Sequence, residues 1–300
     1  MKAPKYLWIY LSLYLGLQGT ICPSQMRAQV LDIVRLEHTS ISRGEGISYN
    51  RQRFMMNFPV KIKDDAYWLL GVDYSRIELD FKEEVSEFNT NDLTNFNILD
   101  LSTSYTYKMN EDWRFAANLE LGFSSNFSRS TMLSDDFVLS ALVVFIKDKK
   151  EAPDVPKPYR WILGAAFSEN SGVPFPIPFV SYYLRFRPRW SLNLGVPTAN
   201  LQYRISEKIR LKAVASLDGF ESNLQERIPV NGDEQADRIR MAVIVGGLRT
   251  EYNFSKHVES FLVTNYVLSN NIHLRRGVDR LITLNHDNRL YVRIGIRVKP

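Results

Sequence analysis

Apolar and polar residues alternate with a period of two along most of the chain. In Trp190–Val196 and in Ile209–Leu217 every second residue is apolar, and residues 290–299 repeat the pattern. Such alternation is typical of β-strands with one apolar and one polar face. No helical period is sustained over more than about ten residues. The pattern therefore predicts an all-β protein.

The connections between these runs also follow a pattern, because short polar turns alternate with longer polar loops. Asn110–Asp112 and Ser206–Lys208 are short turns, whereas residues 82–95, 219–237 and 271–288 are predicted long loops. The two weakest strand predictions flank Pro197. Merging them would leave thirteen strands, and because such a barrel needs an even number, twelve is the alternative to the count that follows. The alternating runs predict fourteen strands, near 30–38, 51–62, 67–81, 96–109, 113–125, 137–147, 159–168, 178–187, 190–196, 199–205, 209–218, 238–254, 258–270 and 289–299.

Short turns at one end and long loops at the other are typical of a transmembrane antiparallel β-barrel with periplasmic turns and extracellular loops. A sheet in a membrane must close on itself, because unpaired backbone groups are costly in hydrocarbon. A secreted β-sandwich also has alternating strands, but its strands have about five or six residues. Several runs here exceed ten residues, which favours the barrel over a soluble secreted β-protein.

The first 28 residues predict a secretory signal peptide. Lys2 and Lys5 precede an apolar run, Tyr6–Leu17, and cleavage is expected near Ala28. Residues 29–300 would then form the barrel domain. Removing residues 1–28 takes away three basic residues and no acid, so 35 basic residues face 33 acidic ones. The mature chain would contain no Cys, which excludes disulfides and Cys-ligated metals.

The composition agrees with a folded, aromatic-rich barrel. Aromatic residues make up 12% of the chain, enough to exclude a disordered protein. Aromatic residues near strand ends, where a barrel meets the membrane surface, predict interfacial girdles; examples are Trp68, Tyr105, Trp113, Trp161, Tyr182 and Trp190.

The middle of the chain resembles a known family. The segments that carry the likeness are Pro174–Pro178, Ser181–Tyr183, Trp190–Pro197 and Leu201–Arg204. They resemble an uncharacterised family of Gram-negative outer-membrane β-barrel proteins, known only as a domain of unknown function. The resemblance implies a barrel in the outer membrane and brings no activity, substrate or catalytic residue. The last strand ends in Arg297–Pro300, without the aromatic residue that usually ends such barrels.

The polar face of the strands predicts a charged lumen. With the apolar face towards lipid, a set of basic side chains points inward near the short turns: Arg114, Arg185, Arg187, Arg204, Arg210, Lys212 and Arg297. We call this set the basic ring. A basic constriction favours anions in a pore. Deeper positions, namely Asp73, Glu120, Asp218 and Arg293, are expected to pair across the lumen.

These residues leave two functions open for the barrel. A narrow, anion-preferring pore uses the basic ring as a constriction, whereas a structural or binding barrel uses the same charges to fill the lumen. A fourteen-stranded barrel is wide enough for a narrow channel and is easily blocked by an inserted segment.

An enzyme is the alternative from another class. His38 and Ser40 stand two residues apart on one face of the first strand, as in outer-membrane lipid hydrolases, where imidazole takes the serine proton. The third group would come from Asn50, Glu37 or Asn270. We treat this pair as a weak candidate, because two residues of these types often fall two apart by chance.

The expected partners follow from the barrel. They are outer-membrane lipids, the barrel-assembly machinery during insertion, and small solutes or ions. The sequence predicts no cofactor, no metal site and no nucleic-acid partner, since it contains no nucleotide fingerprint or metal-ligand spacing.

Overall fold

The fold was obtained as a computed structural model, which describes residues 32–42, 46–81, 90–129, 131–150, 155–168, 175–230, 234–284 and 289–300. The predicted signal peptide lies outside the described residues. No helix in the described part of the chain is long and apolar enough to cross a membrane.

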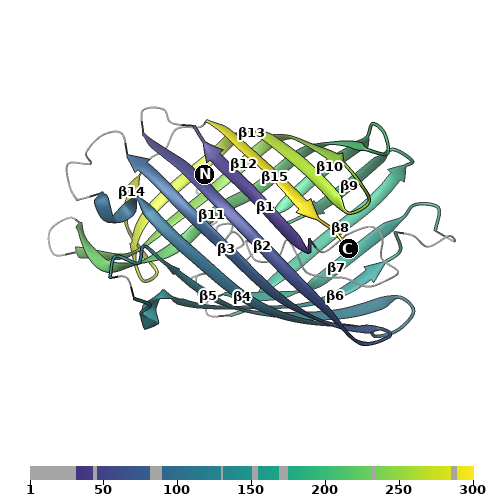
Figure 1. Cartoon of the computed structure of the whole chain (residues 1–300), viewed down its shortest axis with the longest axis horizontal. Helices are drawn as coiled ribbons and strands as arrows, with labels where there is room; N and C mark the ends of the chain where they lie inside the picture. The colour runs from purple at the N-terminus through teal and green to yellow at the C-terminus, as the bar shows by residue number, and fades with distance from the viewer. Residues whose placement is uncertain are drawn as a thin grey trace, which may run out of the picture.

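The described strands form one closed antiparallel barrel (Figure 1). Each strand pairs with the next from β1 to β13, and β15 closes the ring between β13 and β1. The wall strands are β1 (Val34–Ile41), β2 (Ile47–Lys63), β3 (Ala66–Phe81), β4 (Asn95–Lys108), β5 (Trp113–Ser125), β6 (Phe137–Asp148), β7 (Tyr159–Ser168), β8 (Ile177–Arg187), β9 (Trp190–Gly195), β10 (Thr198–Arg204), β11 (Ile209–Val230), β12 (Glu234–Asn253), β13 (Val258–Arg276) and β15 (Leu290–Val298). The predicted fourteen-stranded barrel is confirmed.

The strand β14 (Asp279–Leu284) is additional to the wall. It pairs only with the end of β13, as a hairpin that extends the barrel at one rim. We call this rim the loop end and the opposite rim, which carries the turns at residues 64–65, 109–112, 188–189, 205–208 and 254–257, the turn end. In Figure 1, β14 lies at one end of the barrel, and β9 and β10 lie at the other.

Two predicted loops were wrong, because strands occupy most of them. Residues 219–237 belong largely to a hairpin that β11 and β12 form, and residues 271–288 contain the end of β13 and β14. The hydrophobic period fails there for a physical reason. Residues 218–225 are all buried, so this stretch has no exposed polar face to alternate with an apolar one.

The two faces of the wall differ as alternation requires. On β11, Ala213 and Ala215 are exposed on the outer face, whereas Lys212 and Asp218 point inward. Large apolar side chains such as Leu70, Leu262 and Ile294 keep about half of their surface exposed on the outer face. An exposed apolar band of this kind is what the hydrocarbon of a membrane covers.

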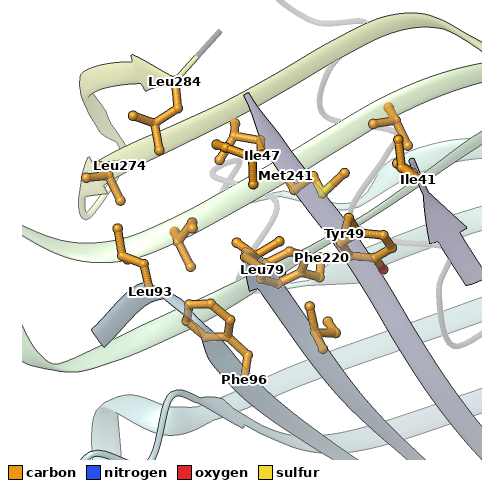
Figure 2. Packing of buried hydrophobic residues seen from close by; sticks show 14 of the residues in the cluster. Ile41, Ile47, Tyr49, Leu79, Leu93, Phe96, Phe220, Met241, Leu274 and Leu284 are labelled. Atoms are coloured by element: carbon orange, nitrogen blue, oxygen red, sulfur yellow. The ribbon is translucent and has the colours of Figure 1, made fainter. Parts of the chain in front are cut away.

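The inner face carries an apolar cluster at the loop end. Buried side chains from β1 to β4 meet those from β11 to β15, among them Tyr49, Phe96, Phe220 and Met241. Figure 2 shows these residues converging between opposite walls. The ring centroids of Phe96 and Phe220 lie 5.4 Å apart, and those of Tyr49 and Phe220 lie 6.1 Å apart. This end of the lumen is therefore filled with side chains.

Candidate functional site

The polar network predicted at mid-lumen is centred on two buried carboxylates. Asp218 accepts hydrogen bonds from Tyr291 Oη at 2.6 Å and from Arg293, and Arg51 lies 3.2 Å away. Asp73 accepts two bonds from Arg53 Nε, at 2.9 and 3.0 Å. A buried carboxylate is costly unless a cation and hydrogen bonds compensate it, and both acids have that compensation.

Of the four residues predicted to pair across the lumen, Asp218 and Arg293 contact each other. Asp73 instead pairs with Arg53, which was not among the predicted residues. Arg51 and Arg53 stand two positions apart on the polar face of β2, so period two alone could have identified them. Glu120 lies on the same cavity wall as Asp73 and Asp100. That cavity has a volume of about 80 Å³, which is room for about five water molecules.

Three members of the basic ring contact buried acids on β12 and β13. Arg210 Nε and Lys212 Nζ each lie 2.8 Å from a carboxylate oxygen of Glu251, and Arg297 Nε donates to Glu259 at 2.7 Å. Neither acid has exposed surface. This side of the turn end is therefore an ion-pair network, which Arg249 and Lys299 complete.

The other members of the ring lie on β5, β8 and β10. Arg114 donates to the backbone oxygen of Asp65 at 3.2 Å. Within the described ranges, no acidic partner is recorded for Arg185, Arg187 or Arg204. The members of the basic ring without an acidic partner among the described residues therefore lie on β8 and β10, where Arg187 and Arg204 are exposed.

A further basic side chain at this end comes from the connection between β6 and β7. Lys150 is buried, and its Nζ lies 4.4 Å from the centroid of the Tyr183 ring. Burial, together with the nearby positive charge of Arg160, lowers the pKa of Lys150 to about 7. The sequence analysis missed Lys150 because it lies in a charged, Pro-rich connection without strand alternation.

The loop end of the lumen is crossed by the hairpin that β11 and β12 form. β11 leaves the wall beyond Ser216, the last residue in register with β10, and Asn223 pairs in parallel with Ser125 of β5. Counted around the wall, β5 is six strands away from β11. The hairpin therefore spans the mouth of the barrel to reach the opposite side.

The β11 strand of the hairpin is held to the opposite wall by polar contacts. Asp136, fully buried, accepts hydrogen bonds from Asn223 Nδ2 at 2.7 Å and Gln225 Nε2 at 2.6 Å. Ser124 Oγ donates to the backbone oxygen of Glu221 at 2.7 Å. None of these residues was selected from the sequence, because only the hairpin's position across the lumen brings them together.

The hinge of the hairpin is Gly219. Its φ is +147°, a conformation that L side chains rarely adopt, and a Cβ there would lie 2.1 Å from the backbone oxygen of Met241. Glycine thus permits β11 to turn from the wall into the lumen at this point.

The weak catalytic candidates lie on the outer face of β1. His38 is exposed beside Leu36, and Ser40 shares this face, whereas Glu37 points inward to Arg35 at 2.9 Å. Ser40 is in register with Asn50, and Asn270 lies on β13. Among the described residues, no hydrogen bond to His38 is recorded, so a triad is not assembled. In the same part of the chain, no group of three or more His, Asp or Glu residues could hold a metal ion.

A closed fourteen-stranded barrel with an apolar outer band and a charged lumen defines an outer-membrane type of β-barrel protein. Residues 37–299 match the family described as Domain of unknown function (DUF6268). The chain therefore belongs to this family. No curated protein matches the sequence.

The chain is similar to several solved structures at low sequence identity. The COG4313 outer membrane channel from Pseudomonas putida F1 is 12% identical to this chain, with a TM-score of 0.44. The match covers 93% of this chain and 100% of the channel's chain. LpxR from Salmonella typhimurium is 9% identical, with a TM-score of 0.41, and the match covers 89% of this chain and 99% of the LpxR chain. The KdgM porin in complex with disordered oligogalacturonate is 9% identical with a TM-score of 0.36, also at 89% and 99% coverage.

Proposed function

We propose that this protein is a narrow outer-membrane channel for a small solute, and that the conformation described above is its closed state. The observation that carries the proposal is the hairpin across the loop end. A purely structural barrel needs only its wall ladders, whereas here a segment leaves the wall and covers a polar cavity. Besides its apolar packing, the hairpin is held to the opposite wall by hydrogen bonds, which can exchange with water when the hairpin moves.

The charge distribution supports a weak preference for anions. Arg210, Lys212 and Arg297 are compensated by acids, so the basic ring acts mainly through Arg185, Arg187 and Arg204. Positive charge on one side of a constriction raises the local concentration of anions. We therefore expect anion preference that declines at high ionic strength, because the Debye length falls to about 3 Å at 1 M salt.

Locking the hairpin tests the channel. Ser125 and Asn223 are a register pair between the hairpin and the opposite wall, so Ser125→Cys with Asn223→Cys can form a disulfide that fixes the β11 strand of the hairpin. The refolded protein, without its predicted signal peptide, would be placed in planar bilayers. We expect current steps in the reduced state and their loss on oxidation.

The matched control is a disulfide within a wall ladder. Glu78 and Asn95 are a register pair of β3 and β4 near the same end, so Glu78→Cys with Asn95→Cys should leave the current unchanged on oxidation. Equal currents in the oxidised and reduced hairpin pair would show that the hairpin is no gate. If neither pair nor the parent shows current steps, the channel fails and a structural or binding barrel replaces it.

A further inference from the structure

The wall of the barrel is unusually short on one side. β5 has 13 residues, β6 has 12, β7 has 10 and β8 has 11, but β9 has 6 and β10 has 7. β11, the next strand, has 22 residues. The short hairpin of β9 and β10 thus stands between two much taller parts of the wall.

Six or seven residues are too few to cross the hydrocarbon of a membrane. A spanning strand needs about 9 to 11 residues. At about 3.3 Å per residue and a tilt near 40°, a strand of this length covers roughly 15 Å of an apolar band about 25 Å tall. About 10 Å of the band is therefore left without wall at β9 and β10.

The part of the wall that β9 and β10 do not supply lies towards the loop end. Trp190 begins β9, and its ring centroid lies 4.7 Å from that of Tyr203 near the end of β10. Trp161 and Tyr182 form a similar pair on β7 and β8, 4.3 Å apart. Aromatic pairs at strand ends mark the membrane interface. Because β9 starts at the turn-end interface, its other end stops inside the hydrocarbon.

The hydrogen-bonded ladders stop at the same place. In the described residues, the β8–β9 ladder ends at Ser181 and Gly195. The β10–β11 register ends at Thr198 and Ser216, and one further backbone bond follows, from Leu217 N–H to the oxygen of Pro197 at 2.9 Å. Beyond Ser216, β11 bends into the lumen at Gly219. We call this interruption, between residues 177–180 of β8 and residues 218–222 of β11, the lateral break.

The edge of β8 at the lateral break suits contact with hydrocarbon. Pro178 carries no N–H, so it leaves one donor fewer to satisfy without water. Val180, Leu194 and Val196 are exposed on the outer face, with 51, 49 and 40% of their surface accessible. Phe179, on the inner face, packs against the apolar cluster of β5 to β7.

Apolar side chains also continue from the lateral break into the lumen. Phe220, directly beyond Gly219, is buried against Tyr49 and Phe96 in the loop-end cluster. The path from hydrocarbon to lumen therefore has apolar residues on the outer rim, on the inner rim and behind it.

The β11 edge also carries Asp218 and Glu221, which are buried and paired with arginines. The path is therefore apolar where it meets the membrane and charged deeper in the lumen. At the membrane, a molecule with an apolar body has favourable contacts and a soluble polar solute does not.

We propose that the lateral break is an opening between the lumen and the membrane, through which the solute of this channel, a molecule with an apolar body such as an acyl chain or ring, passes into the outer-leaflet hydrocarbon. This assignment rests on the proposed channel function and names the class of its solute. We specify a solute with an apolar body because the lateral break faces the hydrocarbon itself and not an aqueous phase.

Quenching by brominated acyl chains tests the proposal. A single cysteine would be labelled with bimane at Phe179→Cys, on the inner face beside the lateral break, in barrels reconstituted with phospholipids brominated on their chains. Val180→Cys is the outward reference. Ser75→Cys, buried on the inner face of full-length β3 at a similar height above the turn end, is the matched inward control.

We expect the loss of fluorescence at position 179 to approach that at position 180, and position 75 to remain unquenched. If positions 179 and 75 are both unquenched while 180 is quenched, hydrocarbon does not enter and the proposal is overturned. Quenching of 179 by aqueous iodide but not by brominated chains would also overturn it, because the opening would then be aqueous. Since this readout needs no current, its failure is distinguishable from failure of the channel.

Discussion

Single residues in the lumen are governed by the cost of burying charge. Glu251 and Glu259 have no exposed surface, and each contacts more than one basic side chain. Removing one partner of such a group leaves a buried charge without compensation, which costs about 3 to 5 kcal/mol. The inward basic side chains follow from period two, but the acid that compensates each one depends on strand register, which the sequence does not reveal.

Lys150 should give the channel a pH-dependent selectivity. The charged groups that face it are Asp148, Arg160, Arg185 and Lys212. With a pKa of about 7, the Lys150 amine is mostly protonated at pH 6 and mostly neutral at pH 8. Positive charge at the turn end therefore increases as the pH falls. Reversal potentials in a KCl gradient should show stronger anion preference at pH 6 than at pH 8.

Two lysine variants separate this effect from a general change of charge. Lys150→Met should abolish the difference between pH 6 and pH 8. The neighbour Lys149, whose Nζ pairs with Asp112, provides the control, and Lys149→Met should keep the difference. A pH effect that survives in Lys150→Met would assign it to another group.

At the scale of elements, the wall strands were predictable and the hairpin was not. Twelve consecutive pairings, from β1–β2 to β12–β13, and the closure by β15 follow from strands that alternate and are joined by recognisable turns. The stretch from Gly219 to Gln225 is buried on both faces, so it lacks the alternation that identifies a wall strand. Its place across the lumen depends on long-range contacts with β5 and Asp136, which no local pattern encodes.

Asp136 should control the position of the hairpin. Asp136→Ala removes the carboxylate that Asn223 and Gln225 bind, and hydrogen bonds to a charged group contribute about 1.5 to 3 kcal/mol each. A loss of about 2 kcal/mol would raise the open fraction roughly 30-fold, because 1.4 kcal/mol is a factor of ten. Bilayer recordings should show more frequent current steps.

The adjacent acid supplies the control for this variant. Asp135 is exposed, and among the described residues its recorded hydrogen bond is the one it accepts from Ser134, so Asp135→Ala should conduct as the parent does. Both variants should keep heat-modifiable migration in mild detergent, because the wall ladders are untouched. Increased current in Asp135→Ala would attribute the effect to surface charge, not to the hairpin.

At the scale of the whole molecule, one bend accounts for two features of the barrel. When β11 leaves the wall at Gly219, the hairpin covers the loop end, and the same departure leaves the lateral break above β9 and β10. If the hairpin returned to the wall, the loop end would open and the lateral break would narrow. The two openings are therefore expected to alternate, so that solute enters from one side while the other is closed.

Gly219→Ala should shift this balance. The new Cβ would meet the backbone oxygen of Met241, and a side-chain residue at this φ costs about 1 to 3 kcal/mol, so the bent hairpin is disfavoured. Current steps should become more frequent while quenching of bimane at position 179 by brominated chains decreases. Gly277→Ala is the control, because Gly277 also has positive φ but a Cβ there meets nothing within 4 Å. If current and quenching rise or fall together in Gly219→Ala, the two openings are independent and the bend does not couple them.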